Sequence, residues 1–251
     1  MSVPKVIHYC WFGGNPLPPS ALKCIKSWKK FCPDYQIIEW NESNFDISGN
    51  RYAREASSAG KWAFVSDYAR LKIIYDHGGI YLDTDVELLC SFDPLLDSDG
   101  FLGFQSDGFV ATGLGFGAVR HHPVIHALLD DYQNIPFFLE NGKEDLMPCP
   151  NRNTKVLQQL GLTANMHRIQ NIKNLLVYPP EYFCPKNFYT GHLKITRNTY
   201  SIHHYDSSWF SPERKAYIRH LHRMHRLEKL LGPKLFAFIK YLWHRLHGKP
   251  E

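Results

Sequence analysis

The first forty residues alternate between a strand pattern, a helix pattern and a second strand pattern, and this order constrains the fold most. Residues 5–10, in PKVIHYCWFGG, favour a strand that runs into a Gly turn. Residues 18–31 begin with Pro and carry apolar residues at helical spacing, and YQIIEW favours a second strand. Such a unit has parallel strands with the helix packed on the sheet. The sequence therefore predicts an α/β fold whose opening strands run parallel.

Length and charge divide the chain into two parts. A chain of 251 residues is long enough for one large α/β domain with an appendage. Residues 211–251 hold ten Lys or Arg and three Glu, a net charge of +7, which leaves −2 of the total +5 for residues 1–210. We expect a folded domain over residues 1–210 and a basic tail over residues 211–251. The basic charge belongs to the tail rather than to the domain.

The cysteines and the N-terminus indicate a cytoplasmic protein with free thiols. The six cysteines are scattered and none forms a CxxC pair, which argues against a zinc or thioredoxin-type site. The stretch MSVPKVIHYC lacks the basic-then-apolar order of a signal peptide. No window approaches the roughly 18 uninterrupted apolar residues of a membrane span.

Two aspartates follow a short apolar strand in DHGGIYLDTDVELL. Asp83 and Asp85 lie two apart directly after Ile80–Leu82, so in an extended chain they point to the same side. Two close carboxylates repel unless a cation or proton joins them, and hard ions such as Mg²⁺ suit oxygen ligands and phosphates. In open α/β sheets, ligands bind at the carboxyl ends of strands. The pattern favours a metal and phosphate site there, with a simple polar turn as the alternative.

The preceding helix carries a second polar group. Residues 61–76 predict a helix with a Gly C-cap. Ser66 and Arg70 lie four apart and Asp67 and Arg70 three apart, so these side chains share one region of the helix surface. Taken alone, Asp67 and Arg70 predict a solvated ion pair of little energetic value.

Three separated motifs resemble glycosyltransferase family 32 and its bacterial relatives, and more distantly the catalytic domain of the large glucosylating toxins. SDYARLKIIYDHGGIYLDTDVELL is similar to the sugar-binding DXD region, PKVIHYCWFGG to the N-terminal strand, and NTYSIHHYDSSW to the C-terminal segment. The three motifs occur in the family's order between residues 4 and 209. The resemblance implies a GT-A catalytic domain over residues 1–210, with a mostly parallel central sheet flanked by helices, while the motifs do not cover the tail.

The resemblance also implies roles for individual residues. Asp85 would bind Mn²⁺ or Mg²⁺ directly, with Asp83 at the ribose or a metal-bound water. Asp67 and Arg70 would hold the donor's sugar hydroxyls and phosphate, which replaces the solvated reading of the pair. The other donor-binding candidates, from the strand ends, the helix and the C-terminal motif, are Trp11, Tyr9, Cys10, Ser66, Tyr81, Ser208 and Trp209.

The late strand in NTYSIHHYDSSW carries a third metal-ligand candidate. In similar enzymes a histidine on this strand completes the metal shell, and the following Ser-Trp closes over the diphosphate. Strand alternation sends His203 and His204 to opposite faces, so one of them is expected at the ion. We favour His203, because it follows Ile202 where the strand ends.

The function implied is metal-dependent, retaining transfer of a hexose from a nucleotide sugar, by default UDP-linked. The acceptor would be a glycan or lipid-linked glycan in cell-surface polysaccharide synthesis, such as capsular or lipopolysaccharide synthesis. The alternative is a non-catalytic module that binds nucleotide sugars or carbohydrate. Nucleic-acid binding is disfavoured, because the chain has no known recognition motif.

The tail predicts two helices that are broken at Gly232 and Pro233 and carry apolar residues at helical spacing. Basic amphipathic helices bind anionic lipid, which would place the enzyme peripherally on the inner membrane face through residues 212–247. Packing of the same helices on the domain is an equally weighted alternative.

Overall fold

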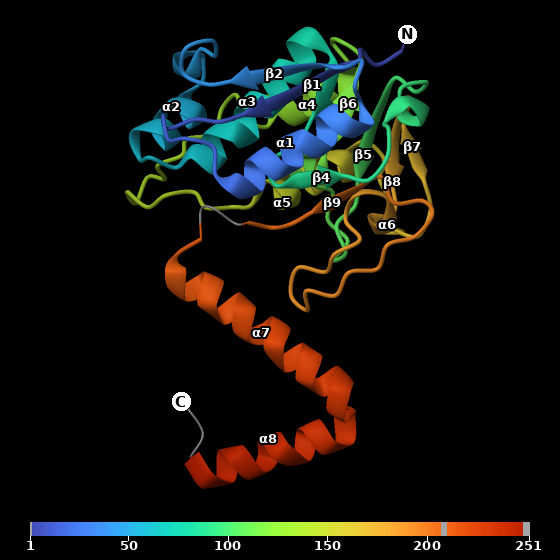
Figure 1. The fold of residues 1–251 in the computed structure, drawn as a ribbon. Helices are drawn as coiled ribbons and strands as arrows, with labels where there is room; N and C mark the ends of the chain where they lie inside the picture. The colour runs from blue at the N-terminus through green and yellow to red at the C-terminus, as the bar shows by residue number, and fades with distance from the viewer. Residues whose placement is uncertain (1, 207–209, 248–251) are drawn as a thin grey trace. The chain divides into compact units, whose positions relative to one another are not determined.

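The computed structural model describes residues 2–206 and 210–247. The chain divides into two compact units, one of residues 1–186 and 194–209 and one of residues 187–193 and 210–251. Figure 1 shows a sheet with its helices in the first unit and helices α7 and α8 in the second. The domain boundary predicted between residues 210 and 211 stays a prediction.

The order of elements follows the sequence patterns closely. The strands are β1 Val6–Cys10, β2 Gln36–Trp40, β3 Gly79–Tyr81, β4 Val86–Leu88, β5 Gly100–Gly103, β6 Phe116–Ala118, β7 Gln170–Ile172, β8 Leu175–Tyr178 and β9 Ser201–His203. The helices are α1 Pro19–Phe31, α2 Arg51–Ser58, α3 Trp62–His77, α4 Pro123–Asp130, α5 Cys149–Gln159, α6 Pro180–Phe183, α7 Pro212–Leu231 and α8 Pro233–His247. Three 3₁₀ helices lie between them, η1 Ile47–Gly49, η2 Asp93–Leu95 and η3 Thr112–Leu114.

The central sheet has seven strands in the order β2-β1-β3-β6-β5-β8-β7. β1 pairs in parallel with β2 and β3, and β5 pairs in parallel with β8. β6 and β7 run the opposite way to the other five. The sheet is therefore mixed but mostly parallel, and the predicted α/β class is confirmed. β4 and β9 form a separate two-stranded antiparallel sheet.

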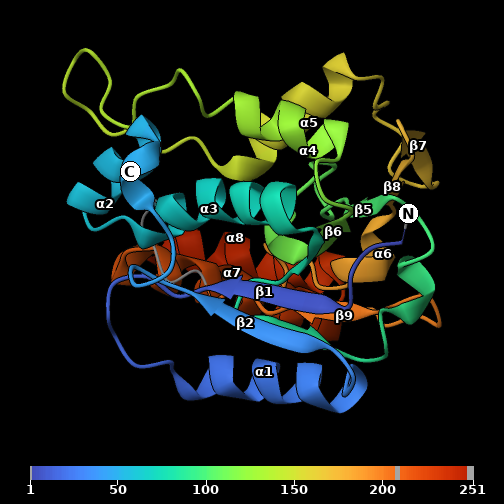
Figure 2. The same ribbon diagram turned by 90° about the horizontal axis from the view of Figure 1, so that it is seen from above.

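Helices cover both faces of the central sheet, as Figure 2 shows from above. One hydrophobic core joins one face to helices α2–α5, with Tyr52, Leu71 and Leu157 among its buried residues. The other core joins the opposite face to α1 and α6, with Trp28 and Phe183 fully buried. β1 and β3 are thus buried from both sides, which explains why their sequences are apolar apart from the buried His8.

Two glycines connect α3 to β3. Gly78 and Gly79 have φ values of 69° and 98°, a region that favours glycine. A Cβ on Gly78 would lie 2.9 Å from the Arg120 backbone nitrogen, and one on Gly79 would lie 2.8 Å from the Val6 carbonyl oxygen. The Gly-Gly pair therefore lets the chain reverse tightly and enter the sheet, and this fixes where the following aspartates emerge.

The second unit contains the two helices that the tail predicts. Gly232, with φ 77°, ends α7, and Pro233 begins α8. His222 on α7 donates from Nε2 to the Phe188 carbonyl at 2.8 Å, which ties residues 187–193 to this unit. Large apolar side chains on α8 stay exposed, among them Phe238 at 56%. Across the described residues, every helix is too short or too polar to cross a bilayer.

Candidate active site

A tight turn brings Asp83 and Asp85 together at the carboxyl end of β3. The Val86 backbone N–H donates to the Asp83 carbonyl at 3.0 Å, which closes a four-residue turn between β3 and β4. The two carboxylates converge through this turn. Ligand atoms of Asp83, Asp85 and His203 all lie within 4.8 Å of one another. We call these three residues the acidic–His group.

Pairing of β9 with β4 delivers the histidine of this group. Val86 lies opposite His203, and His203 Nε2 lies 3.1 Å from Asp85 Oδ1. The backbone N–H groups of His204 and Asp206 donate to the Asp85 carbonyl and to Asp85 Oδ2, each at 2.9 Å. Three contacts from the β9 segment therefore hold Asp85 in place.

The second histidine candidate lies elsewhere. His204 Nε2 is 2.7 Å from Glu87 Oε2, on the other side of the β9 strand. Strand alternation separates the two histidines as expected, and the structure brings His203 but not His204 to the aspartates. His204 does not belong to the acidic–His group.

Electrostatics within the acidic–His group favour a cation. Burial raises the pKa of Asp85, but the adjacent His203 outweighs this and lowers the pKa to about 2. Burial raises the pKa of Asp83 against the effect of Arg70. His203 Nδ1 is buried and has no hydrogen-bond partner among the described residues. Two carboxylates and an imidazole are a donor set that fits Mn²⁺ or Mg²⁺, so these residues fit the expected metal.

Arg70 joins the helix α3 to the first aspartate. Its guanidinium lies 2.7 Å from Asp67 Oδ1 and 3.6 Å from Asp83 Oδ1, and its side chain is only 5% exposed. Arg70 Nε donates to the Ser66 carbonyl at 3.0 Å, so Ser66 contributes through its backbone. The reading of Asp67 and Arg70 as a solvated ion pair is therefore wrong. The pair is buried and faces Asp83.

Tyr81 contacts both Asp83 and Arg70. Its hydroxyl donates to Asp83 Oδ1 at 3.0 Å, and the Arg70 guanidinium lies 5.2 Å from the centre of its ring. Tyr81 is 1% exposed. The side chain thus supports both the first aspartate and the arginine that pairs with it.

A glycine that sequence analysis did not single out makes room for this group. A Cβ on Gly113 would overlap Asp83 Oδ2 and approach Arg70 Nη1 at 3.2 Å. Gly113 lies in η3, within the Gly-rich stretch GFVATGLGFG. The dense Gly spacing was the available signal, because glycine permits close approach of the backbone.

The three candidates at the end of β1 differ in accessibility. The side chains of Tyr9 and Cys10 are buried, and the Tyr9 hydroxyl donates to Glu39 at 2.6 Å. Trp11 is partly exposed, and its indole N–H donates to the Asn15 carbonyl at 2.5 Å. Among these three, only Trp11 presents a ring for stacking. The candidates Ser208 and Trp209 lie outside the described residues.

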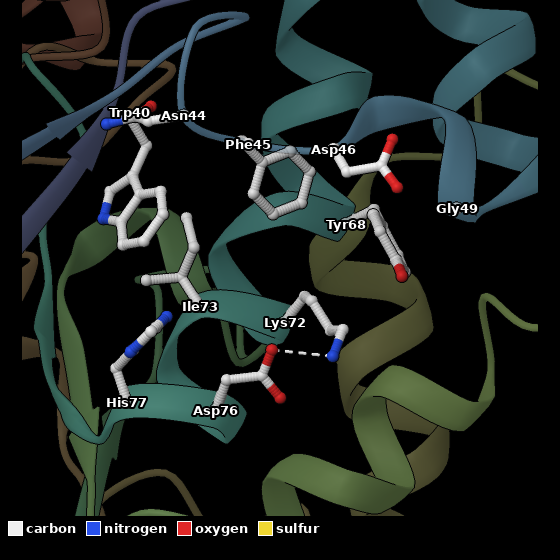
Figure 3. Close-up of a pocket in the computed structure, with 10 residues that line it drawn as sticks. All are labelled: Trp40, Asn44, Phe45, Asp46, Gly49, Tyr68, Lys72, Ile73, Asp76 and His77. Carbon is white, nitrogen blue, oxygen red and sulfur yellow. Dashed lines mark hydrogen bonds and ion pairs between the residues drawn. The ribbon is translucent and has the colours of Figure 1, made fainter.

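A separate cavity of about 260 Å³ lies between α3 and the segment after β2 (Figure 3). Trp40, Phe45 and Tyr68 form its aromatic walls, and Lys72 pairs with Asp76 at 2.6 Å along its edge. Of the residues predicted for the donor or metal site, none that the structure describes lines this cavity. The acidic–His group is therefore a distinct feature of the first unit.

Residues 18–102 match the family model described as "Glycosyltransferase sugar-binding region containing DXD motif". This segment is similar to the DXD region of glycosyltransferases. The DXD region includes Asp67, Arg70, Asp83 and Asp85, while His203 lies beyond its end. The resemblance expected from the sequence motifs is confirmed.

Two curated relatives carry glycosyltransferase names. The chain is 29% identical over 144 residues to inositol phosphoceramide mannosyltransferase 3 of Schizosaccharomyces pombe, covering 56% of this chain and 39% of that protein. It is 26% identical over 179 residues to human alpha-1,4-N-acetylglucosaminyltransferase, covering 69% and 45%. The chain thus spans less than half the length of these relatives.

Among solved structures, the PaToxG glycosyltransferase aligns with a TM-score of 0.47 and 20% sequence identity. That alignment covers 63% of this chain and 70% of the other.

Proposed function

We propose that this protein is a metal-dependent glycosyltransferase that moves a hexose from a nucleotide sugar to a glycan or lipid-linked glycan. One observation carries the proposal, the convergence of Asp83, Asp85 and His203 beside the buried Asp67–Arg70 pair in the DXD region. The acidic–His group supplies ligands for a divalent cation. The adjacent pair supplies the Arg70 guanidinium for phosphate and the Asp67 carboxylate for sugar hydroxyls.

Each residue of the site has a proposed role. Asp85, Asp83 and His203 would hold Mn²⁺ or Mg²⁺, which when bound neutralises charge on the donor diphosphate. Arg70 would donate hydrogen bonds to the departing phosphate, where negative charge grows as the sugar leaves. Asp67 would accept from hydroxyls of the donor sugar, and Trp11 would stack on the base.

Stereochemistry and substrates are proposed from resemblance. Family 32 enzymes are retaining, so the acceptor hydroxyl would attack from the face that the diphosphate vacates. The relatives are named for mannose and for N-acetylglucosamine transfer, which supports a hexose or hexosamine donor. We keep a UDP-linked hexose as the first donor to test and cell-surface polysaccharide synthesis in the cytoplasm as the setting.

A melting-temperature screen with UDP- and GDP-linked sugars tests the function. A donor that binds only the folded protein, at 100 times its Kd, should raise the melting temperature by about 5–10 °C in the presence of Mn²⁺. The shift should be much smaller with EDTA. No shift with any nucleotide sugar would contradict the proposal, and a shift without sugar transfer to any acceptor would favour a binding module.

The pH dependence of this shift provides an internal control. Burial lowers the pKa of His203, but the carboxylates of Asp85 and Asp83 outweigh it and raise the pKa. A protonated histidine cannot bind a metal. Because its pKa is raised, His203 stays partly protonated at pH values above the ordinary His pKa of about 6.5, and protons compete there with the metal ion. The Mn²⁺-dependent shift should therefore be larger at about pH 8 than at about pH 6.

We further propose that α7 and α8 bind anionic lipid and hold the enzyme peripherally at the inner membrane face. Nine Lys and Arg residues of α7 and α8 accompany apolar side chains such as Phe238 and Ile239, which remain 56% and 44% exposed. Deleting residues 212–251 should abolish co-sedimentation with vesicles of phosphatidylglycerol, while wild type should not bind neutral phosphatidylcholine vesicles. Equal binding of the deleted and full chains would contradict this role.

A further inference from the structure

We propose that Lys186 binds a phosphate of the donor diphosphate, as a second cation beside Arg70. This inference rests on the proposed function and adds a residue that neither the motifs nor the family match single out. Lys186 lies in the loop after α6, and its Nζ donates to the His204 carbonyl at 2.6 Å. The ammonium is therefore attached to the segment that supplies His203.

The loop that carries Lys186 is tied to the acidic–His group at several points. The Cys184 sulfur lies 2.8 Å from the Tyr205 hydroxyl, so the loop and the segment after β9 are in contact at two neighbouring positions. That segment in turn donates to Asp85 through the backbone of His204 and of Asp206. Lys186 thus lies at the Asp85 end of the group, whereas Arg70 joins the group at Asp83.

Charge supports the same placement. Burial lowers the pKa of Lys186, while the carboxylates of Asp206 and Asp85 act to raise it. The Lys186 charge also acts to lower the pKa of His203. These effects mark Lys186 as a close electrostatic neighbour of two metal-ligand candidates. Its half-buried position strengthens its attraction for an anion that enters the site.

The ammonium has hydrogen-bonding capacity to spare. A lysine has three N–H donors, and within residues 2–206 and 210–247 the His204 carbonyl is the single acceptor within hydrogen-bond distance of Nζ. Asp67 is paired with Arg70, and a bound divalent cation would neutralise Asp83 and Asp85. Lys186 would then face the site as a cation with two donors left. Phosphate oxygens of a metal-bound diphosphate are acceptors that could take these two hydrogen bonds.

Two variants separate phosphate binding from a purely structural role for Lys186. Lys186→Met keeps much of the side-chain length but removes the charge, and Lys186→Arg keeps the charge. Lys194→Met is the matched control. Lys194 is exposed, and its backbone N–H donates to the carbonyl of Pro185, the residue before Lys186. Titration calorimetry should use Mn²⁺ alone, and UDP and GDP in saturating Mn²⁺, with the full-length protein.

Lys186→Met should weaken binding of the preferred diphosphate by about 10- to 100-fold, the effect of losing a charged hydrogen bond. Lys186→Arg and Lys194→Met should stay within about threefold of wild type. Lys186→Met should bind Mn²⁺ alone at least as tightly as wild type, because a cation beside the metal ligands is removed. Its melting temperature should fall by only a few degrees, because one hydrogen bond is lost. If Lys186→Met left diphosphate binding unchanged, or weakened Mn²⁺ binding as much as diphosphate binding, the inference about Lys186 would be wrong and the proposed function would stand. A wild type that binds neither diphosphate would overturn the proposed function and this inference with it.

Discussion

Replacing Asp85 by Asn should lower the rate of glycosyl transfer by about 1,000-fold or more. Asp85 is held by His203 and by the Asp206 backbone N–H, and its pKa of about 2 keeps it charged at neutral pH. Asn keeps the shape and an oxygen acceptor but loses the charge that a divalent cation needs. Release of free sugar and of transferred product from a labelled donor measures the loss.

Glu87→Gln is the matched control for this variant. Glu87 lies two residues further along the chain, on β4, and pairs with His204 and Lys23 outside the acidic–His group. Its neutralisation should change the rate less than about threefold. The Mn²⁺-dependent melting shift should disappear in Asp85→Asn and persist in Glu87→Gln. Full turnover by Asp85→Asn would remove the carboxylate from the mechanism.

Replacing Arg70 by Met should affect both catalysis and stability. We expect kcat/KM for the donor to fall by about 100- to 1,000-fold, because the departing phosphate loses a charged donor. The variant should also lose about 3 kcal/mol of unfolding free energy, since the buried Asp67 carboxylate loses its ion-pair partner. Burial already raises the pKa of Asp67 to about 6 despite Arg70. Urea unfolding at pH 7 and donor kinetics measure the two effects.

A double variant separates these two effects. Asp67→Asn added to Arg70→Met removes the unpaired buried charge, so most of the lost stability should return. Activity should stay low, because the guanidinium that would bind the departing phosphate is still missing. Recovery of activity together with stability would mean that Arg70 acts only by supporting the fold.

The helices and strands predicted correctly are those whose apolar spacing and Gly or Pro boundaries lie within one short stretch of sequence. The strand–helix–strand opening, α3 with its Gly cap and the break between α7 and α8 all form as expected. Their apolar spacing and their Gly and Pro residues determine these elements with little help from distant contacts.

Features that depend on contacts between distant segments could not be predicted from local sequence patterns. Asp67 and Arg70 share one helix face, but their burial depends in part on η3, where Gly113 leaves room for Asp83. Lys186 carries no local signal, since its neighbours in the site come from β9 and the turn after β3. Strand alternation separated the two histidines correctly, yet only the pairing of β4 with β9 shows which one meets Asp85.

The short β4–β9 ladder determines how much of the chain the proposed site needs. Three residue pairs bring His203 to an aspartate 118 positions earlier in the chain. The segment from residue 18 to 102 contains both aspartates but cannot assemble the three-ligand set by itself. On the proposed function, a trimmed version for engineering or domain fusion should keep its Mn²⁺-dependent activity only when it retains the chain through β9.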